Sequence, residues 1–169
     1  FTADLPSESV RTIVQASTER ILSVYKCSSY RNLRILRNAL WEFDRIYCAL
    51  DPKIQCAHEL VADFLAVFLI YSFEVRSGVL AAAELRNLRM ASFASANASN
   101  PDPNRRYLEI RRKYPDRDIY GTLFTDEVWQ ELLTAGSIPE KAINEALLNS
   151  SYFAAENRPA WIKLWHGED

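Results

Sequence analysis

Glycine is scarce in this 169-residue chain, which contains only four. A phosphate loop of the form Gly-x-x-x-x-Gly-Lys-Ser/Thr requires two glycines at a fixed spacing, and no such segment occurs. Nucleotide hydrolysis by a phosphate-loop mechanism is therefore excluded within this chain. We expect no catalytic residue here and predict a non-enzymatic role.

Metal ligands are also few. Cys56-x-His58 offers two soft ligands, but a structural zinc ion requires four and no second pair has a suitable spacing. We therefore predict no metal site.

Cysteine usage and hydropathy indicate the compartment. Three cysteines without close pairs or a signal peptide do not suggest a disulfide framework. The longest apolar run, residues 60–71, contains Asp63 and is too short to span a bilayer. We expect a cytoplasmic location and no membrane partner. The formal charge of −2 provides no global attraction to nucleic acid.

The apolar spacing is helical throughout, and no alternating strand pattern occurs. It predicts helices over residues 10–25 (with or without a break), 33–50, 53–76, 80–90, 105–114, 125–135 and 140–148, with a short aromatic helix after Pro159. We expect the helix over 53–76 to be central because it is the most apolar. Ser137-x-x-Glu140 matches a capping box for the helix that follows. The fold class predicted is all-α, a helical bundle.

A segment rich in Ala, Ser, Asn and Pro interrupts these helices at residues 91–103. Such composition is typical of a loop or a subdomain boundary. We therefore expect a helical subdomain over 1–90, a linker over 91–103 and a C-terminal helical subdomain over 104–169. The chain begins with Phe1 rather than methionine, and we expect it to be a fragment of a longer protein.

The segment 31–47 combines apolar and basic residues. The apolar residues at 33, 36, 40, 43 and 47 follow three- and four-residue spacing, which directs Arg34 and Arg37 away from the core. Asn32 is placed to cap the helix.

Asn32-Leu33-Arg34-x-Leu36-x-Asn38-x-Leu40 resembles the sensor-2 helix in the lid of AAA+ ATPases, and residues 31–47 are similar to the region after the nucleotide-binding core of KAP-like P-loop ATPases. The resemblance implies that Arg34 contacts the phosphates of bound nucleotide, assisted by Arg31 or Arg37. Many such lids have glycine where this chain has Arg31. The family implies ATP in the full-length protein, a core upstream of Phe1, and partners in the rest of the ATPase chain or neighbouring protomers. Bacterial ATPases of this kind are often tied to defence against phage.

A basic segment provides an alternative. Residues 102–118 contain six basic and four acidic side chains, and the candidate nucleic-acid contacts are Arg105, Arg106, Arg111, Arg112 and Lys113. Such a helix would bind phosphates with little sequence preference. Charge runs are more often solvated helix faces, and acidic side chains between 125 and 156 offer this segment a partner.

An aromatic cluster near the end of the chain provides another alternative. Phe153, Trp161 and Trp165 are of the residue types enriched at protein interfaces. They would dock on the chain's own core or on a partner, which makes a free-standing interaction adaptor the rival to nucleotide sensing. Residues 149–165 also resemble the C-terminal end of the same group of ATPases.

Overall fold

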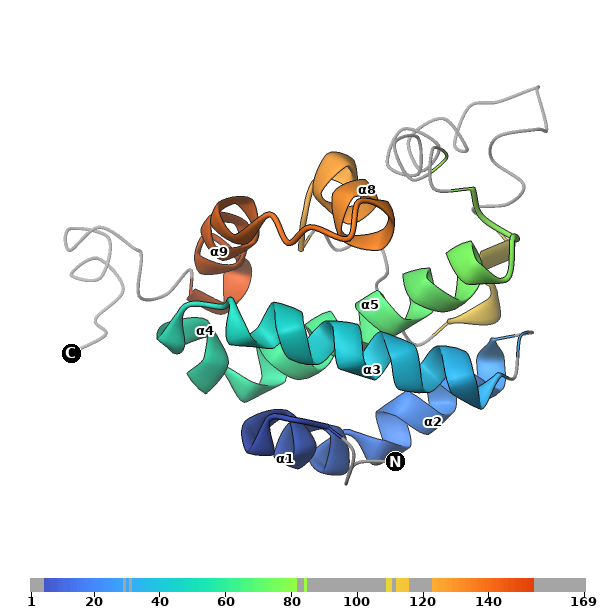
Figure 1. The fold of residues 1–169 in the computed structure, drawn as a ribbon, viewed down its shortest axis with the longest axis horizontal. Coiled ribbons are helices and arrows are strands. Elements are labelled where there is room, and N and C mark those ends of the chain that lie inside the picture. The colour runs from blue at the N-terminus through green and yellow to red at the C-terminus, as the bar shows by residue number, and fades with distance from the viewer. Residues whose placement is uncertain are drawn as a thin grey trace, which may run out of the picture.

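The described residues of the computed structural model are 5–28, 30, 32–81, 84, 109–110, 112–115 and 123–153. These residues form α1 (Glu8–Ala16), α2 (Thr18–Cys27), α3 (Leu33–Cys48), α4 (Pro52–Cys56), α5 (His58–Arg76), α8 (Asp126–Thr134), α9 (Glu140–Leu148) and the 3-10 helix η3 (Ser151–Phe153). No strand occurs in these ranges, so the predicted all-α bundle is confirmed (Figure 1).

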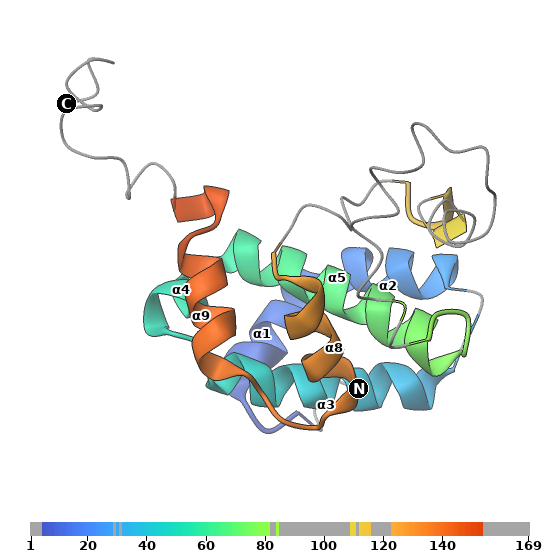
Figure 2. The same cartoon turned by 90° about the horizontal axis from the view of Figure 1, so that it is seen from above.

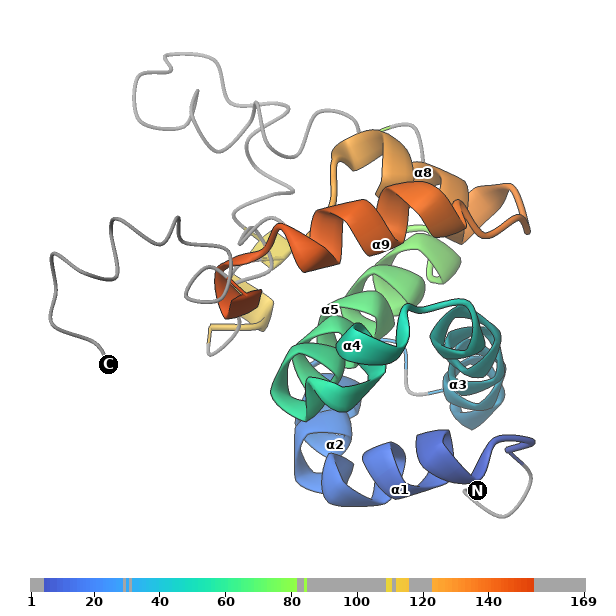
Figure 3. The same cartoon turned by 90° about the vertical axis from the view of Figure 1, so that its left-hand side faces the viewer.

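Helix α5 lies at the centre of the bundle, as its composition predicts. In Figure 3, α5 and α3 run side by side, with α1 and α2 on one side and α8 and α9 on the other. All but two of the residues from Leu60 to Glu74 on α5 are buried because neighbours cover several of its faces. Each large apolar side chain buried there stabilises the fold by about 1.5–3 kcal/mol.

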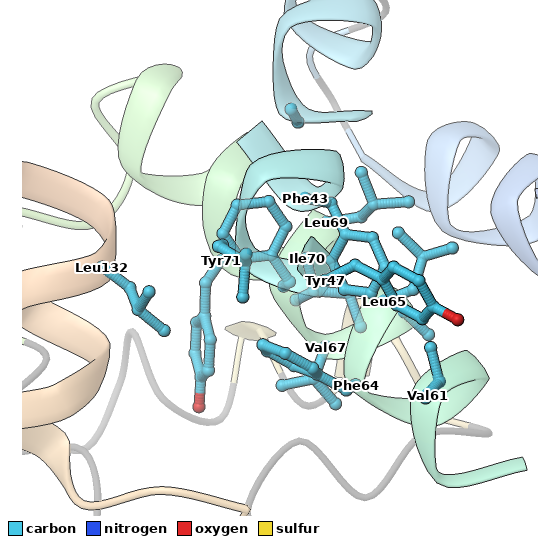
Figure 4. Close-up of a cluster of buried hydrophobic side chains, with 14 of the residues drawn as sticks. Phe43, Tyr47, Val61, Phe64, Leu65, Val67, Leu69, Ile70, Tyr71 and Leu132 are labelled. Carbon is cyan, nitrogen blue, oxygen red and sulfur yellow. The ribbon is translucent and has the colours of Figure 1, made fainter. Parts of the chain in front are cut away.

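Aromatic rings connect α3, α5 and α8 across the core. The Phe64 ring on α5 packs against Phe43 of α3 at 5.2 Å between centroids, against Phe124 at 5.0 Å and against Trp129 of α8 at 6.0 Å. Figure 4 shows Phe43 and Phe64 within this cluster, with Leu132 approaching from α8. Side chains from both sides of the 91–103 segment thus share one core, while the predicted division into two subdomains stays a prediction.

Helix α9 is attached to the turn between α3 and α4 by one side-chain amide. The Asn144 Oδ1 accepts from the Asp51 backbone N–H at 2.8 Å, and its Nδ2 donates to the Ala49 carbonyl at 3.0 Å. The amide therefore satisfies a donor and an acceptor of the same turn. Figure 2 shows α9 passing beside α4.

Two local predictions were wrong. The expected single helix over 53–76 is divided into α4 and α5, since Ala57 has φ −83° and ψ 73°, outside the helical region. The Ser137–Glu140 capping box is not formed: the Ser137 hydroxyl donates instead to Glu131 Oε1 at 3.1 Å, and Pro139 occupies the cap position.

Helices α5 and α8 end at Arg76 and Thr134, close to the predicted residues 76 and 135. Helices α5 and α8 are followed by Gly78 and Gly136, whose φ angles of +74° and +65° favour glycine. Thr125 caps α8 by accepting from the Val128 N–H. The first predicted helix breaks at Ser17 into α1 and α2. The predicted helix over 80–90 and the aromatic helix after Pro159 lie largely or wholly outside the described residues.

Candidate functional site

The exposed face of α3 carries three arginines and a tryptophan. Arg34, Arg37, Trp41 and Arg45 follow spacings of three, four and four residues, which place them on one stripe of the helix. All four are exposed, and the Trp41 side chain retains 46% of its accessible surface. The opposite face, including Leu36, Leu40 and Phe43, is buried against α5 and its neighbours. We call these four residues the basic stripe.

The start of α3 is fixed by a side-chain cap. The Asn32 Oδ1 accepts from the Arg34 backbone N–H at 2.9 Å, as the sequence predicts. Arg34 thus lies in the first turn of a helix that is anchored both by its cap and by its buried face. The position of its Cα is therefore well defined, while its guanidinium extends into solvent.

The arginines of the basic stripe have no ion pair within the described part of the chain. The nearest acids along α3 are engaged elsewhere: Glu42 pairs with Arg76 of α5, and Asp44 is buried and accepts from the Ser7 backbone N–H at 3.2 Å. The stripe itself contains no acidic residue. It therefore presents concentrated positive charge on a chain with a slightly negative net charge.

A groove of about 200 Å³ adjoins the stripe where α3 approaches α8. Arg45 belongs to the stripe and also lines the groove. The groove's remaining walls come from α3, α8 and the α8–α9 loop and include Ile46, Leu132, Leu133, Ser137 and Ile138. The groove lining is thus mixed: four apolar side chains stand beside the polar or charged Glu42, Arg45, Thr134 and Ser137.

A larger cavity of about 660 Å³ lies between α1, α2 and the start of α5. Its charged wall is occupied by an internal network: Arg20 donates to Asp63 at 2.7 Å and contacts Glu59 at 3.5 Å. Tyr152 of η3 donates to the same Asp63, and burial together with this bond raises the pKa of Tyr152 to about 12. The Arg20 guanidinium therefore already has ion-pair partners, and these pairs join α2 to α5.

A buried carboxylate lies at the other end of α5. Glu74 is 1% exposed and accepts from Lys113 Nζ at 2.8 and 3.0 Å and from the Tyr114 hydroxyl at 2.6 Å. Burial and this hydrogen bond raise the pKa of Tyr114 far above its ordinary value. Lys113, a candidate nucleic-acid contact, is thus bound within the protein.

The other predicted site residues are distributed as follows. Arg112 is exposed, and Phe153 is partly buried against the core. The remaining candidates, Arg31, Arg105, Arg106, Arg111, Trp161 and Trp165, lie outside the described residues. No group of three or more potential metal ligands occurs among the described side chains, and no helix within those ranges is long and apolar enough to cross a bilayer.

Sequence reasoning did not identify Trp41 and Arg45 as members of the exposed stripe. Their helical spacing from Arg34 was the available signal, because i+7 and i+11 return to the same face of a helix. The groove had no such signal, since its walls come from segments far apart in the sequence.

No protein-family model, curated protein or solved structure matches this chain. The function is therefore argued from the residues themselves.

Proposed function

We propose that this chain is a non-catalytic helical region of a P-loop ATPase and that Arg34 senses the phosphates of a bound nucleotide. The observation that carries this proposal is the state of Arg34: its side chain is exposed, it has no ion pair in the described structure, and it lies on the first turn of a capped helix. A guanidinium in this state is available for charge-assisted bonds to phosphate oxygens. The resemblance of residues 32–40 to a sensor-2 helix supports the same role.

Arg37 lies one turn further along and is the second phosphate contact in this proposal. Its side chain is also exposed on the basic stripe. Two guanidiniums at i and i+3 lie on neighbouring positions of one helix face, which suits a ligand with several anionic oxygens. The buried face of α3 transmits a displacement of this end to α5, since the two helices pack along their length.

The full-length ATPase with Arg34→Ala tests the assignment. Loss of a hydrogen bond to a charged group is worth about 1.5–3 kcal/mol, so ATP affinity should fall by about 10- to 150-fold. Titration calorimetry with ATP and a turnover assay measure the effect, with far-UV circular dichroism to check the fold. Lys141→Ala, an exposed substitution on α9, serves as the control. Unchanged ATP affinity and turnover in Arg34→Ala would remove the assignment.

The interaction-adaptor alternative has support of its own. Trp41 is a large exposed aromatic one helical turn before Arg45, which lines a partly apolar groove, and such features are typical of protein interfaces. The nucleic-acid alternative is less favoured, because Lys113 is held by Glu74 and Arg112 is the other described cation of that candidate set.

A further inference from the structure

The second half of α3 carries features that phosphate sensing does not use. Trp41 lies one helical turn before Arg45, and Arg45 lines the groove beside α8. The stripe from Arg34 to Arg45 extends about 16 Å along the helix axis. An extended surface of this length combines positive charge, one exposed aromatic ring and a partly apolar groove at one end.

The groove is suited to a single apolar side chain. Its volume of about 200 Å³ is below the roughly 300–1,000 Å³ typical of sites for drug-sized ligands. Leu132 and Leu133 of α8 and Ile138 of the following loop provide its apolar walls.

The charges around the groove favour an acidic partner. Glu42 lines the groove but is paired with Arg76, and Glu131 accepts from the Ser137 hydroxyl at 3.1 Å. Arg45 has no ion pair in the described structure. A carboxylate placed next to Arg45 would therefore gain a charge-assisted hydrogen bond without displacing an existing partner of that arginine.

We propose that Trp41, Arg45 and the groove bind a short acidic segment of a partner protein. One bulky apolar side chain of that segment occupies the groove, and a neighbouring carboxylate contacts Arg45. The partner backbone covers Trp41, whose exposed ring supplies apolar area and an indole N–H donor. Charge complementarity selects an acidic segment, and Leu132, Leu133 and Ile138 in the groove lining suit one apolar side chain between its carboxylates.

Peptide selection on the purified chain tests this proposal. A phage-displayed library of random 12-residue peptides is selected on the wild type, and enriched sequences are synthesised and measured by fluorescence anisotropy. Enriched peptides should contain several Asp or Glu residues around one large apolar residue. Arg45→Glu, Trp41→Ala and Ser137→Glu should each weaken binding at least tenfold. These positions are exposed, so circular dichroism should report an unchanged fold.

Two controls make the outcome decisive. Lys141→Glu reverses one exposed charge on α9, away from the groove's lining residues, and should bind the peptides as the wild type does. A 12-nucleotide single-stranded DNA should not displace them at equal concentration. Enrichment without acidic residues, no enrichment, binding indifferent to Arg45→Glu, or displacement by the oligonucleotide would each overturn the proposal. Failure of nucleotide sensing is seen separately, in the ATP affinity of Arg34→Ala.

Discussion

Lys113 and Glu74 form a bidentate ion pair in which the ammonium donates to both carboxylate oxygens, at 2.8 and 3.0 Å. The carboxylate is 1% exposed, whereas the side chain of Lys113 is 22% exposed. The pair joins the segment around residue 113 to the C-terminal end of α5. The Glu74 carboxylate is therefore almost without contact with water, and the Lys113 ammonium is the positive charge that stabilises its ionised form.

Lys113→Met should destabilise the protein because it leaves the buried carboxylate with the Tyr114 hydroxyl alone. Breaking a buried pair in this way costs about 3–5 kcal/mol, and we expect the lower end because Lys113 is partly solvated. Urea unfolding at pH 7 measures the change. Arg112→Met, at an exposed neighbouring position, should change stability by about 0.5 kcal/mol or less. Equal losses in both variants would contradict the account.

The stability of the protein should fall in alkali through Tyr114. Its pKa is raised from an ordinary value of 10.0, mainly by burial and then by its bond to Glu74. Near pH 10 the unfolded chain therefore loses this proton while the folded chain retains it. The free energy of unfolding that Tyr114 contributes is fully present below pH 10 and decreases as the pH rises above 10. The slope is at most about 1.4 kcal/mol per pH unit for one group.

Tyr114→Phe isolates this contribution. Unfolding measured from pH 8 to pH 11 should show a shallower decline for the variant than for the wild type. Tyr152, with a pKa of about 12 and 45% exposure, acts in the same direction, so some decline should remain. Identical slopes would exclude Tyr114 as a source of the alkaline sensitivity.

Phe64→Ala should be among the most damaging core substitutions. The ring is fully buried and contacts aromatic rings of α3, α5 and the α8 region. Truncating a buried phenylalanine costs about 3–5 kcal/mol. Thermal and urea unfolding measure the loss, and Leu22→Ala, whose side chain is 44% exposed, is the matched control. A loss below about 1 kcal/mol would indicate that the core repacks around the cavity.

Asn32→Ala and Ser137→Ala should differ, although both residues resemble helix caps in the sequence. Asn32 accepts from the Arg34 N–H and its loss should cost about 1 kcal/mol. Ser137 is exposed and bonds to an exposed Glu131 side chain, so its loss should cost about 0.5 kcal/mol or less. Urea unfolding of the two variants distinguishes the residue whose cap hydrogen bond is formed from the residue whose cap hydrogen bond is not.

These two residues also show how far sequence reasoning reached. Asn32 was identified correctly because the helical apolar spacing follows it in the sequence. The placement of Leu33 on the buried face was wrong: its side chain is 52% exposed, and the buried stripe of α3 begins at Leu36. At Ser137, the competing partner Glu131 comes from the preceding helix, and Pro139 takes the cap position. The capping-box pattern contains neither fact.

The break at Ala57 had no sequence signal. Cys56, Ala57 and His58 include neither glycine nor proline, and the apolar spacing continues across them. The chain turns there so that Ile54 of α4 is buried while α5 lies along α3. Tertiary packing decides the backbone at this point, which a periodicity argument cannot detect.

Only the arginine-bearing face of α3 could be predicted from the sequence; the groove beside it could not. The exposure of Arg34 and Arg37 follows from the buried stripe of α3, which the sequence displays. The groove beside Arg45 depends on how α8 and its following loop approach α3, and that approach is set by contacts such as those of Trp129 with Phe64 and Tyr71. Such long-range packing has no local pattern.

The two hydrogen bonds of Asn144 have a consequence for the order of folding. Asp51 and Ala49 precede Asn144 by more than ninety residues, so during synthesis these backbone groups stay with water until α9 has left the ribosome. The Asn144 amide, which has both a donor and an acceptor, then replaces the water bound to the Asp51 N–H and the Ala49 carbonyl. We expect the junction of α3 and α4 to be among the last parts of the N-terminal half to become protected from hydrogen exchange.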